Sequence, residues 1–127
     1  MRLHHVACVC SSLENAARFY EEILGLKKIK TASLNKELTE QIFDISLECE
    51  MVTYGNDHFN IEIFVDPHGP KDIVGFGHFC LQVGDREELL RICESAGLPV
   101  KRVPKGDSVV MFIKDFDGNL IEIKGPQ

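Results

Sequence analysis

The sequence predicts an α+β fold of paired βαβββ modules that form a curled mixed sheet with helices on its outer face. Three observations predict it: a strand-like segment leads into a capped helix near the N-terminus, the same order restarts after residue 77, and each half ends in a strand with a glutamate between isoleucines. Such a repeated order indicates an internal duplication. We expect a single domain over residues 1–127, with half-modules at about 1–66 and 77–127.

The first strand and helix have clear local signals. Residues 3–10 (LHHVACVC) are rich in small and β-branched apolar residues, and a pair of serines ends the run. Ser11 with Glu14 three residues on predicts a capping box. Apolar residues then recur at helical spacing over 12–24, and Gly25 suits the end of a helix.

The rest of the first half reads as strands and turns. Residues 27–40 have mixed polarity and no clean period, so we expect a strand or a loop there. Residues 42–47 alternate and residues 50–54 look extended. A Gly-Asn-Asp turn at 55–57 then precedes residues 59–65 (FNIEIFV), another strand.

The second half repeats this order after a loop rich in proline and glycine at 66–77. Residues 78–83 predict a strand, and Asp85 with Glu88 predicts a second capping box. Apolar residues at helical spacing follow, and Gly97 is expected to end this helix. The remaining strands are expected at 100–103, 108–113 and 120–124, with a turn (DFDGN) at 115–119.

Side chains alternate between the two faces of a strand, so each strand can be sorted by parity. We expect one face to pack against the helices; it carries Val6, Cys8, Cys10, Ile61, Ile63, Val65, Phe79, Leu81, Val83, Ile121 and Ile123. The opposite face carries His5, Ala7, Val9, Asn60, Glu62, Phe64, His78, Cys80, Gln82, Leu120, Glu122 and Lys124. Every candidate metal ligand thus has the same parity.

His5, Glu62, His78 and Glu122 are the candidate metal ligands. A lone histidine at a strand start, or a lone glutamate between isoleucines, is more often a structural or solvated residue. Matching positions in both halves favour a metal site instead, because two carboxylates and two imidazoles on one face call for a cation. This ligand set suits one divalent ion of Ni, Co, Mn, Fe or Zn and selects none of them.

Other polar residues are weaker candidates. His4 has the opposite parity and is expected to be structural or at the surface. Glu48 and Glu50 could supply an extra base. Cys80 shares the face of His78, but no basic neighbour or helix N-terminus predicts a reactive thiolate.

Composition limits the class of partner and the compartment. The net charge of −6 does not favour binding to nucleic acid or to an anionic membrane surface, since both are negatively charged. No apolar run approaches the ~20 residues that span a bilayer, and no signal-peptide pattern is visible. The five cysteines are expected to be reduced, mostly buried thiols, so we expect a cytoplasmic protein.

The residues resemble the vicinal oxygen chelate superfamily, which includes glyoxalase I, methylmalonyl-CoA epimerase, extradiol dioxygenases and bleomycin-resistance proteins. The resemblance covers nearly the whole chain. Its marks are His5-Val-Ala, Phe19-Tyr20, Ile23-Leu-Gly-Leu26, Gly77-His78 and Asp115-Phe-Asp-Gly-Asn119 before Ile121-Glu122.

The resemblance implies His5, Glu62, His78 and Glu122 as the ligands of one metal ion, in a single glyoxalase-like domain. Within this superfamily the sequence most resembles bacterial glyoxalase I (lactoylglutathione lyase). That resemblance implies a homodimer in which each metal site takes His5 and Glu62 from one chain and His78 and Glu122 from the other. The implied reaction converts the thiohemiacetal of a 2-oxoaldehyde (methylglyoxal and glutathione) into a 2-hydroxyacyl thioester through an enediolate. Glu122 would be the catalytic base and Glu62 its partner in reprotonation.

Several alternatives share this fold. A methylmalonyl-CoA epimerase-like isomerase uses similar enolate chemistry, although such relatives commonly have Gln at the position of Glu62. A metal-free antibiotic-binding resistance protein of this fold uses an apolar, aromatic cleft. The four intact ligands and the absence of Trp are evidence against this alternative. Fosfomycin-type thiol transfer does not require Glu62, and extradiol dioxygenases often have more half-modules. Cations for the glutathione carboxylates are available at Lys27, Lys28, Lys101, Arg102 and Lys105.

Overall fold

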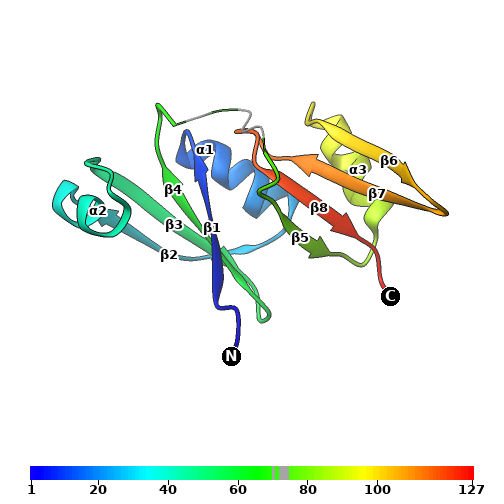
Figure 1. Cartoon of the computed structure of the whole chain (residues 1–127), viewed down its shortest axis with the longest axis horizontal. Coiled ribbons are helices and arrows are strands. Elements are labelled where there is room, and N and C mark those ends of the chain that lie inside the picture. The colour runs from blue at the N-terminus through cyan, green and yellow to red at the C-terminus, as the bar shows by residue number, and fades with distance from the viewer. Residues whose placement is uncertain (70, 72–74) are drawn as a thin grey trace. The chain divides into compact units, whose positions relative to one another are not determined.

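Each half of the chain builds its own four-stranded sheet (Figure 1). The computed structural model describes residues 1–69, 71 and 75–127. The chain divides into a first unit, Met1–Gly69, and a second, Pro70–Gln127. Mixed sheets with few helices confirm the predicted α+β class and its glyoxalase-like modules. The extent of a single domain over the whole chain stays a prediction.

The two sheets have the same topology. The first has the order β1-β4-β3-β2 and the second has the order β5-β8-β7-β6. In each, the first and last strands of the unit are parallel neighbours, and the other pairs are antiparallel. The internal duplication is therefore confirmed in strands β1 His5–Cys10, β2 Lys27–Leu34, β3 Cys49–Gly55, β4 Asn60–Val65, β5 Phe79–Gln82, β6 Val100–Lys105, β7 Ser108–Lys114 and β8 Leu120–Lys124.

The first helix begins as α1 Leu13–Ala16 and continues as a π-helix over Ala17–Ile23. Its N-cap is Ser12, whose Oγ accepts a hydrogen bond from the Asn15 amide at 3.1 Å. The predicted helix is confirmed, but the predicted cap at Ser11 is wrong by one residue. Ser11 Oγ instead accepts from the Asn15 side chain at 3.2 Å. Either serine satisfies the capping preference, and the extended backbone falls at the second.

The strand or loop expected at 27–40 is present as a strand only in β2, and a short helix, α2 Lys36–Phe43, replaces the rest of that segment and the start of the alternating segment at 42–47. Asn35 caps it by accepting from the Leu38 amide at 2.9 Å, and Asp44 ends it in a left-handed conformation with φ 57°. Thr39 is its one buried residue among those described. Leu38 and Ile42, spaced four residues apart, are exposed, and this short pair gave too little helical periodicity to predict the helix.

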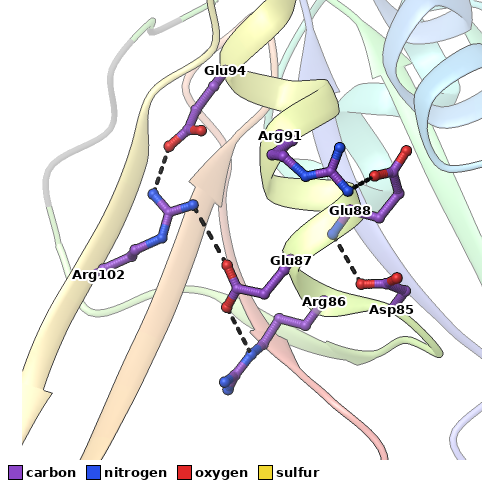
Figure 2. A network of polar contacts seen from close by, with 7 residues as sticks. All are labelled: Asp85, Arg86, Glu87, Glu88, Arg91, Glu94 and Arg102. Carbon is purple, nitrogen blue, oxygen red and sulfur yellow. Dashed lines mark hydrogen bonds and ion pairs between the residues drawn. The ribbon is translucent and has the colours of Figure 1, made fainter.

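The third helix, α3 Arg86–Ser95, confirms the predicted cap and stripe. Asp85 accepts a hydrogen bond from the Glu88 amide at 3.0 Å, and Leu90 and Cys93 are fully buried. Arg102 on β6 reaches Glu94 at 2.5 Å and Glu87 at 3.8 Å, as Figure 2 shows. These ion pairs tie one face of β6 to the exposed side of α3.

The apolar core confirms the parity prediction. The isoleucines that flank the two glutamates are buried in both units, and Phe19 and Tyr20 of the first helix are buried as well. Glu62 and Glu122 consequently project from the opposite face of their sheets. In residues 1–69, 71 and 75–127, no helix combines the length and apolar character needed to cross a membrane.

Candidate functional site

The first unit brings His5 and Glu62 together on the face of its sheet that is opposite the buried isoleucines. Strands β1 and β4 are parallel neighbours, with His5 in register with Asn60 and Ala7 in register with Glu62. The His5 imidazole therefore lies beside the glutamate two residues along the partner strand. Its Nε2 is 3.4 Å from Glu62 Oε2, and the side chains are 41% and 18% exposed.

The second unit forms a matching pair. His78 precedes β5 directly, and its Nε2 lies 3.6 Å from Oε2 of Glu122 on β8. His78 Nδ1 lies 2.8 Å from the carbonyl oxygen of Phe76, which can only accept. Nδ1 therefore carries hydrogen. In the neutral imidazole, Nε2 then presents its lone pair toward the carboxylate.

The donor atoms of each pair would suit one half of a metal site. A neutral nitrogen lone pair and a carboxylate oxygen repel each other unless a cation or a proton lies between them. A backbone carbonyl that fixes the other ring nitrogen is the usual orienting partner of a metal-bound histidine. At the bond angles of tetrahedral and octahedral sites, nitrogen and oxygen ligands of one first-row ion are about 3.0–3.5 Å apart. The two observed separations, 3.4 and 3.6 Å, match that range or lie just above it.

Each pair supplies two donors. Within the described part of the chain, no three His, Cys, Asp or Glu side chains are grouped so that they could hold a metal ion. The structure therefore brings His5 to Glu62 and His78 to Glu122, each within its own unit. The gathering of all four ligands around one ion stays a prediction.

The neighbours of the two glutamates differ. We call the four residues in register across each sheet the glutamate row. The first glutamate row consists of Ala7, Glu62, Thr53 and Lys30, and the second consists of Cys80, Glu122, Phe112 and Lys101. The first therefore places a hydroxyl beside its glutamate, whereas the second places an aromatic ring and a thiol there.

Phe112 and Lys124 complete the surroundings of the second pair. The Phe112 ring packs edge-on against His78, with centroids 5.5 Å apart. Lys124 Nζ is 3.7 Å from the other carboxylate oxygen of Glu122. Burial and the negative charge of Glu122 raise the pKa of the Cys80 thiol, so it stays protonated near neutral pH. The expectation that Cys80 has no basic neighbour is wrong, because Lys124 acts on this thiol in the opposite direction, although burial and Glu122 outweigh it.

The strand registers also sort the basic residues by face. Lys101 and Lys105 share the face of Glu122, whereas Arg102 lies on the opposite face and pairs with α3. Lys27 shares the face of Glu62, whereas Lys28 is opposite Tyr54 on the other face. Among the remaining candidates, His4 is exposed, with Nδ1 3.1 Å from Nδ1 of His5.

Thr53, Lys30 and Phe112 on this face were not identified from the sequence. Their parity relative to Glu62 and Glu122 depends on how β3 and β7 pair with their neighbours, which a single sequence does not reveal. For Lys30 a bulge between Lys28 and Lys30 also shifts the register, so counting along the strand alone does not place its side chain.

Comparisons with known proteins identify the family of the chain. A family model described as Glyoxalase/Bleomycin resistance protein/Dioxygenase superfamily matches residues 2–123. A probable chloroplastic lactoylglutathione lyase of Arabidopsis thaliana is 30% identical over 135 residues, which cover 98% of this chain and 36% of that protein. This chain spans 36% to 45% of the length of the plant lactoylglutathione lyases that it matches.

Solved structures of low sequence identity share the fold. A glyoxalase family protein from Bacillus cereus is 23% identical with a TM-score of 0.74, and the match covers 98% of this chain and 93% of that one. A trypanothione-dependent glyoxalase I of Leishmania major is 20% identical with a TM-score of 0.71, and the match covers 98% and 86%. Because the family model spans nearly all of the sequence, the chain belongs to the glyoxalase/bleomycin resistance protein/dioxygenase superfamily, also called the vicinal oxygen chelate superfamily.

Proposed function

We propose that this protein is a metal-dependent lyase/isomerase of the glyoxalase I type, which converts a 2-oxoaldehyde thiohemiacetal into a 2-hydroxyacyl thioester through an enediolate. The observation that carries the proposal is the pair of equivalent His–Glu contacts, His5 with Glu62 and His78 with Glu122. The lactoylglutathione lyases among its relatives support this reaction in preference to others in the superfamily.

The two pairs supply the four ligands of one divalent ion in this proposal, with Ni, Zn, Co, Mn and Fe as candidates. A bound ion of this class supplies Lewis-acid stabilisation of negative charge on two adjacent substrate oxygens. His78, held by the Phe76 carbonyl through Nδ1, keeps Nε2 aimed at the site.

The carboxylates move the proton. Glu122 acts as the base that removes the proton next to the substrate carbonyl, and Glu62 assists in its return to the adjacent carbon. Each carboxylate approaches its histidine through the same oxygen, Oε2. The Phe112 ring packs against His78 on the Glu122 side, where it would shield part of the site from water.

The proposal also specifies the substrate, the oligomeric state and the compartment of the protein. The substrate is a small molecule with glutathione as the thiol, and Lys101 and Lys105 lie on the correct face for its carboxylates. The protein acts as a homodimer, with His5 and Glu62 from one chain and His78 and Glu122 from its partner. The five free cysteines suit a reducing compartment, which we take to be the cytoplasm.

Metal reconstitution followed by activity measurement tests this function. The apoprotein is loaded separately with Ni, Zn, Co, Mn and Fe and assayed with methylglyoxal plus glutathione and with methylmalonyl-CoA. We expect isomerisation of the methylglyoxal–glutathione adduct with at least one metal. Epimerisation of methylmalonyl-CoA without glyoxalase turnover would assign the rival enolate chemistry, and failure to bind any of the metals would point to a metal-free binding protein.

A further inference from the structure

Thr53 is a buried polar residue beside Glu62 that the proposed reaction leaves without a role. It is 3% exposed, and Thr53 Oγ1 has no hydrogen-bond partner among the described residues. A buried hydroxyl that stays unpaired keeps the full cost of its desolvation. A ligand oxygen bound on this face would remove that cost.

The direction of the Thr53 side chain follows from the strand register. Thr53 on β3 is directly opposite Glu62 on β4, so both side chains project from the same face of the first sheet. The Thr53 side chain therefore lies next to the Glu62 side chain, on the face where His5 also lies, although its hydroxyl forms no hydrogen bond to the carboxylate.

Lys30 extends this polar row by one strand. It is in register with Thr53 and exposed, and it forms no ion pair within the part of the chain that the structure describes. Its backbone is two strands from Glu62, a spacing of about 9–10 Å. A lysine stem of four methylene groups can bring an ammonium over Thr53, close to a group bound at Glu62.

The second sheet has no equivalent of the pair formed by Thr53 and Lys30 in the first sheet. Its glutamate row also ends in a lysine, Lys101, but the residue between Lys101 and Glu122 is Phe112. An ammonium next to a hydroxyl, each able to donate a hydrogen bond, forms an anion-binding pair. An aromatic ring in the same place does not.

From this asymmetry we infer that Thr53 and Lys30 bind an anionic group of the substrate, a carboxylate or a phosphate, next to its chelating oxygens on the Glu62 side. The inference rests on the proposed function and narrows its substrate class. The 2-oxo compound would carry its own anionic group, separate from the carboxylates of the thiol. Methylglyoxal, with an uncharged methyl group, would leave Thr53 unpaired.

Two small chelators test the inference by binding. Acetohydroxamate and succinic monohydroxamate both present two adjacent oxygens to a metal, but only the second carries an additional carboxylate. Calorimetry on the zinc- or nickel-loaded protein should show tighter binding of the second. We expect Lys30→Met to weaken that binding by about tenfold and to leave acetohydroxamate unchanged. Thr53→Val should likewise weaken the binding of succinic monohydroxamate and leave that of acetohydroxamate unchanged.

Lys28→Met is the matched control. Lys28 belongs to the same strand and is exposed, but it is in register with Tyr54 and projects from the opposite face. This variant should bind both chelators as the wild type does. Lys30→Arg, which keeps the positive charge, should retain most of the preference for succinic monohydroxamate.

The failures of the two proposals are distinguishable. Equal affinity of the wild type for both chelators, or an equal loss of both in Lys30→Met or Thr53→Val, would overturn the anion-binding pair and leave the metal site standing. Failure of the metal-loaded wild type to bind either chelator would instead contradict the proposed function, and the inference with it.

Discussion

The side chains of Glu62 and Glu122 are equally exposed, at 18% each, although they belong to different sheets. Each is the third residue of the last strand of its unit, and each has a histidine Nε2 within 3.6 Å of Oε2. The same local fold thus holds the two carboxylates in the same way. Their neighbours differ: Thr53 is opposite Glu62, whereas Phe112 is opposite Glu122, and Lys124 contacts Glu122 as well.

Replacing Glu122 by Gln should separate metal binding from turnover. The amide oxygen can still ligate, whereas the nitrogen cannot accept a proton, so kcat should fall by at least about 100-fold. Metal content by mass spectrometry should stay near that of the wild type. Glu37→Gln is the control, since Glu37 is an exposed residue of α2. Wild-type turnover in Glu122→Gln would remove this residue from its assigned role.

Gly55 should tolerate no side chain. A Cβ there would lie 2.7 Å from the carbonyl oxygen of Phe59 and 2.8 Å from Ile29 Cδ1. A backbone atom cannot yield as a flexible side chain does, so Gly55→Ala should lower the free energy of unfolding by ~1–3 kcal/mol. Gly84→Ala is the matched control, because nothing lies within 4 Å of its Cβ position. Equal denaturation midpoints for the two variants would contradict the close packing around Gly55.

Cys93 should make stability fall at alkaline pH. Burial raises its thiol pKa from 9.0 to about 11. The unfolded chain ionises first, so this stabilisation is complete below pH 9 and is lost as the pH rises toward 11. The loss is at most about 1.4 kcal/mol per pH unit. Denaturation of wild type and Cys93→Ala across this range should show a shallower decline in the variant; parallel curves would rule out the effect.

Arg102 should contribute little to stability despite its ion pairs. Glu94 and Glu87 hold its guanidinium and raise the pKa of Arg102 further, but the group lies at the surface, where such pairs are weak (Figure 2). Arg102→Met should therefore shift the denaturation midpoint much less than Gly55→Ala does. High salt should shrink the difference from the wild type, and a large, salt-independent loss would mean that the aliphatic stem supplies the stabilisation.

Local patterns predicted most of the fold because they are sufficient on their own at several places. Asp85, the buried stripe of α3 and Gly97 determine one helix completely. Alternation around Ile61 and Ile121 determines which face carries the glutamates. Helix α2 was not predicted because residues 42–47 alternate, which favours a strand, and because Leu38 and Ile42 form only a short pair at helical spacing.

The candidate site was predictable in part for a related reason. Each His–Glu pair follows from strand parity together with the duplication, and both pairs are present. Thr53, Lys30 and Phe112 depend on non-local pairing of β2, β3 and β7 and on one bulge. That information lies in the partner strand, so no pattern within the strand itself reveals it.

Metal stoichiometry tests the four-ligand site most directly. The protein and its His5→Ala and His78→Ala variants are loaded with zinc or nickel, dialysed and measured for metal per chain. One ion per chain is expected in the wild type, with affinity reduced by at least about tenfold in each variant, because both histidines bind the same ion. Two ions per chain, with one lost in each variant, or no retained metal at all, would contradict the shared site.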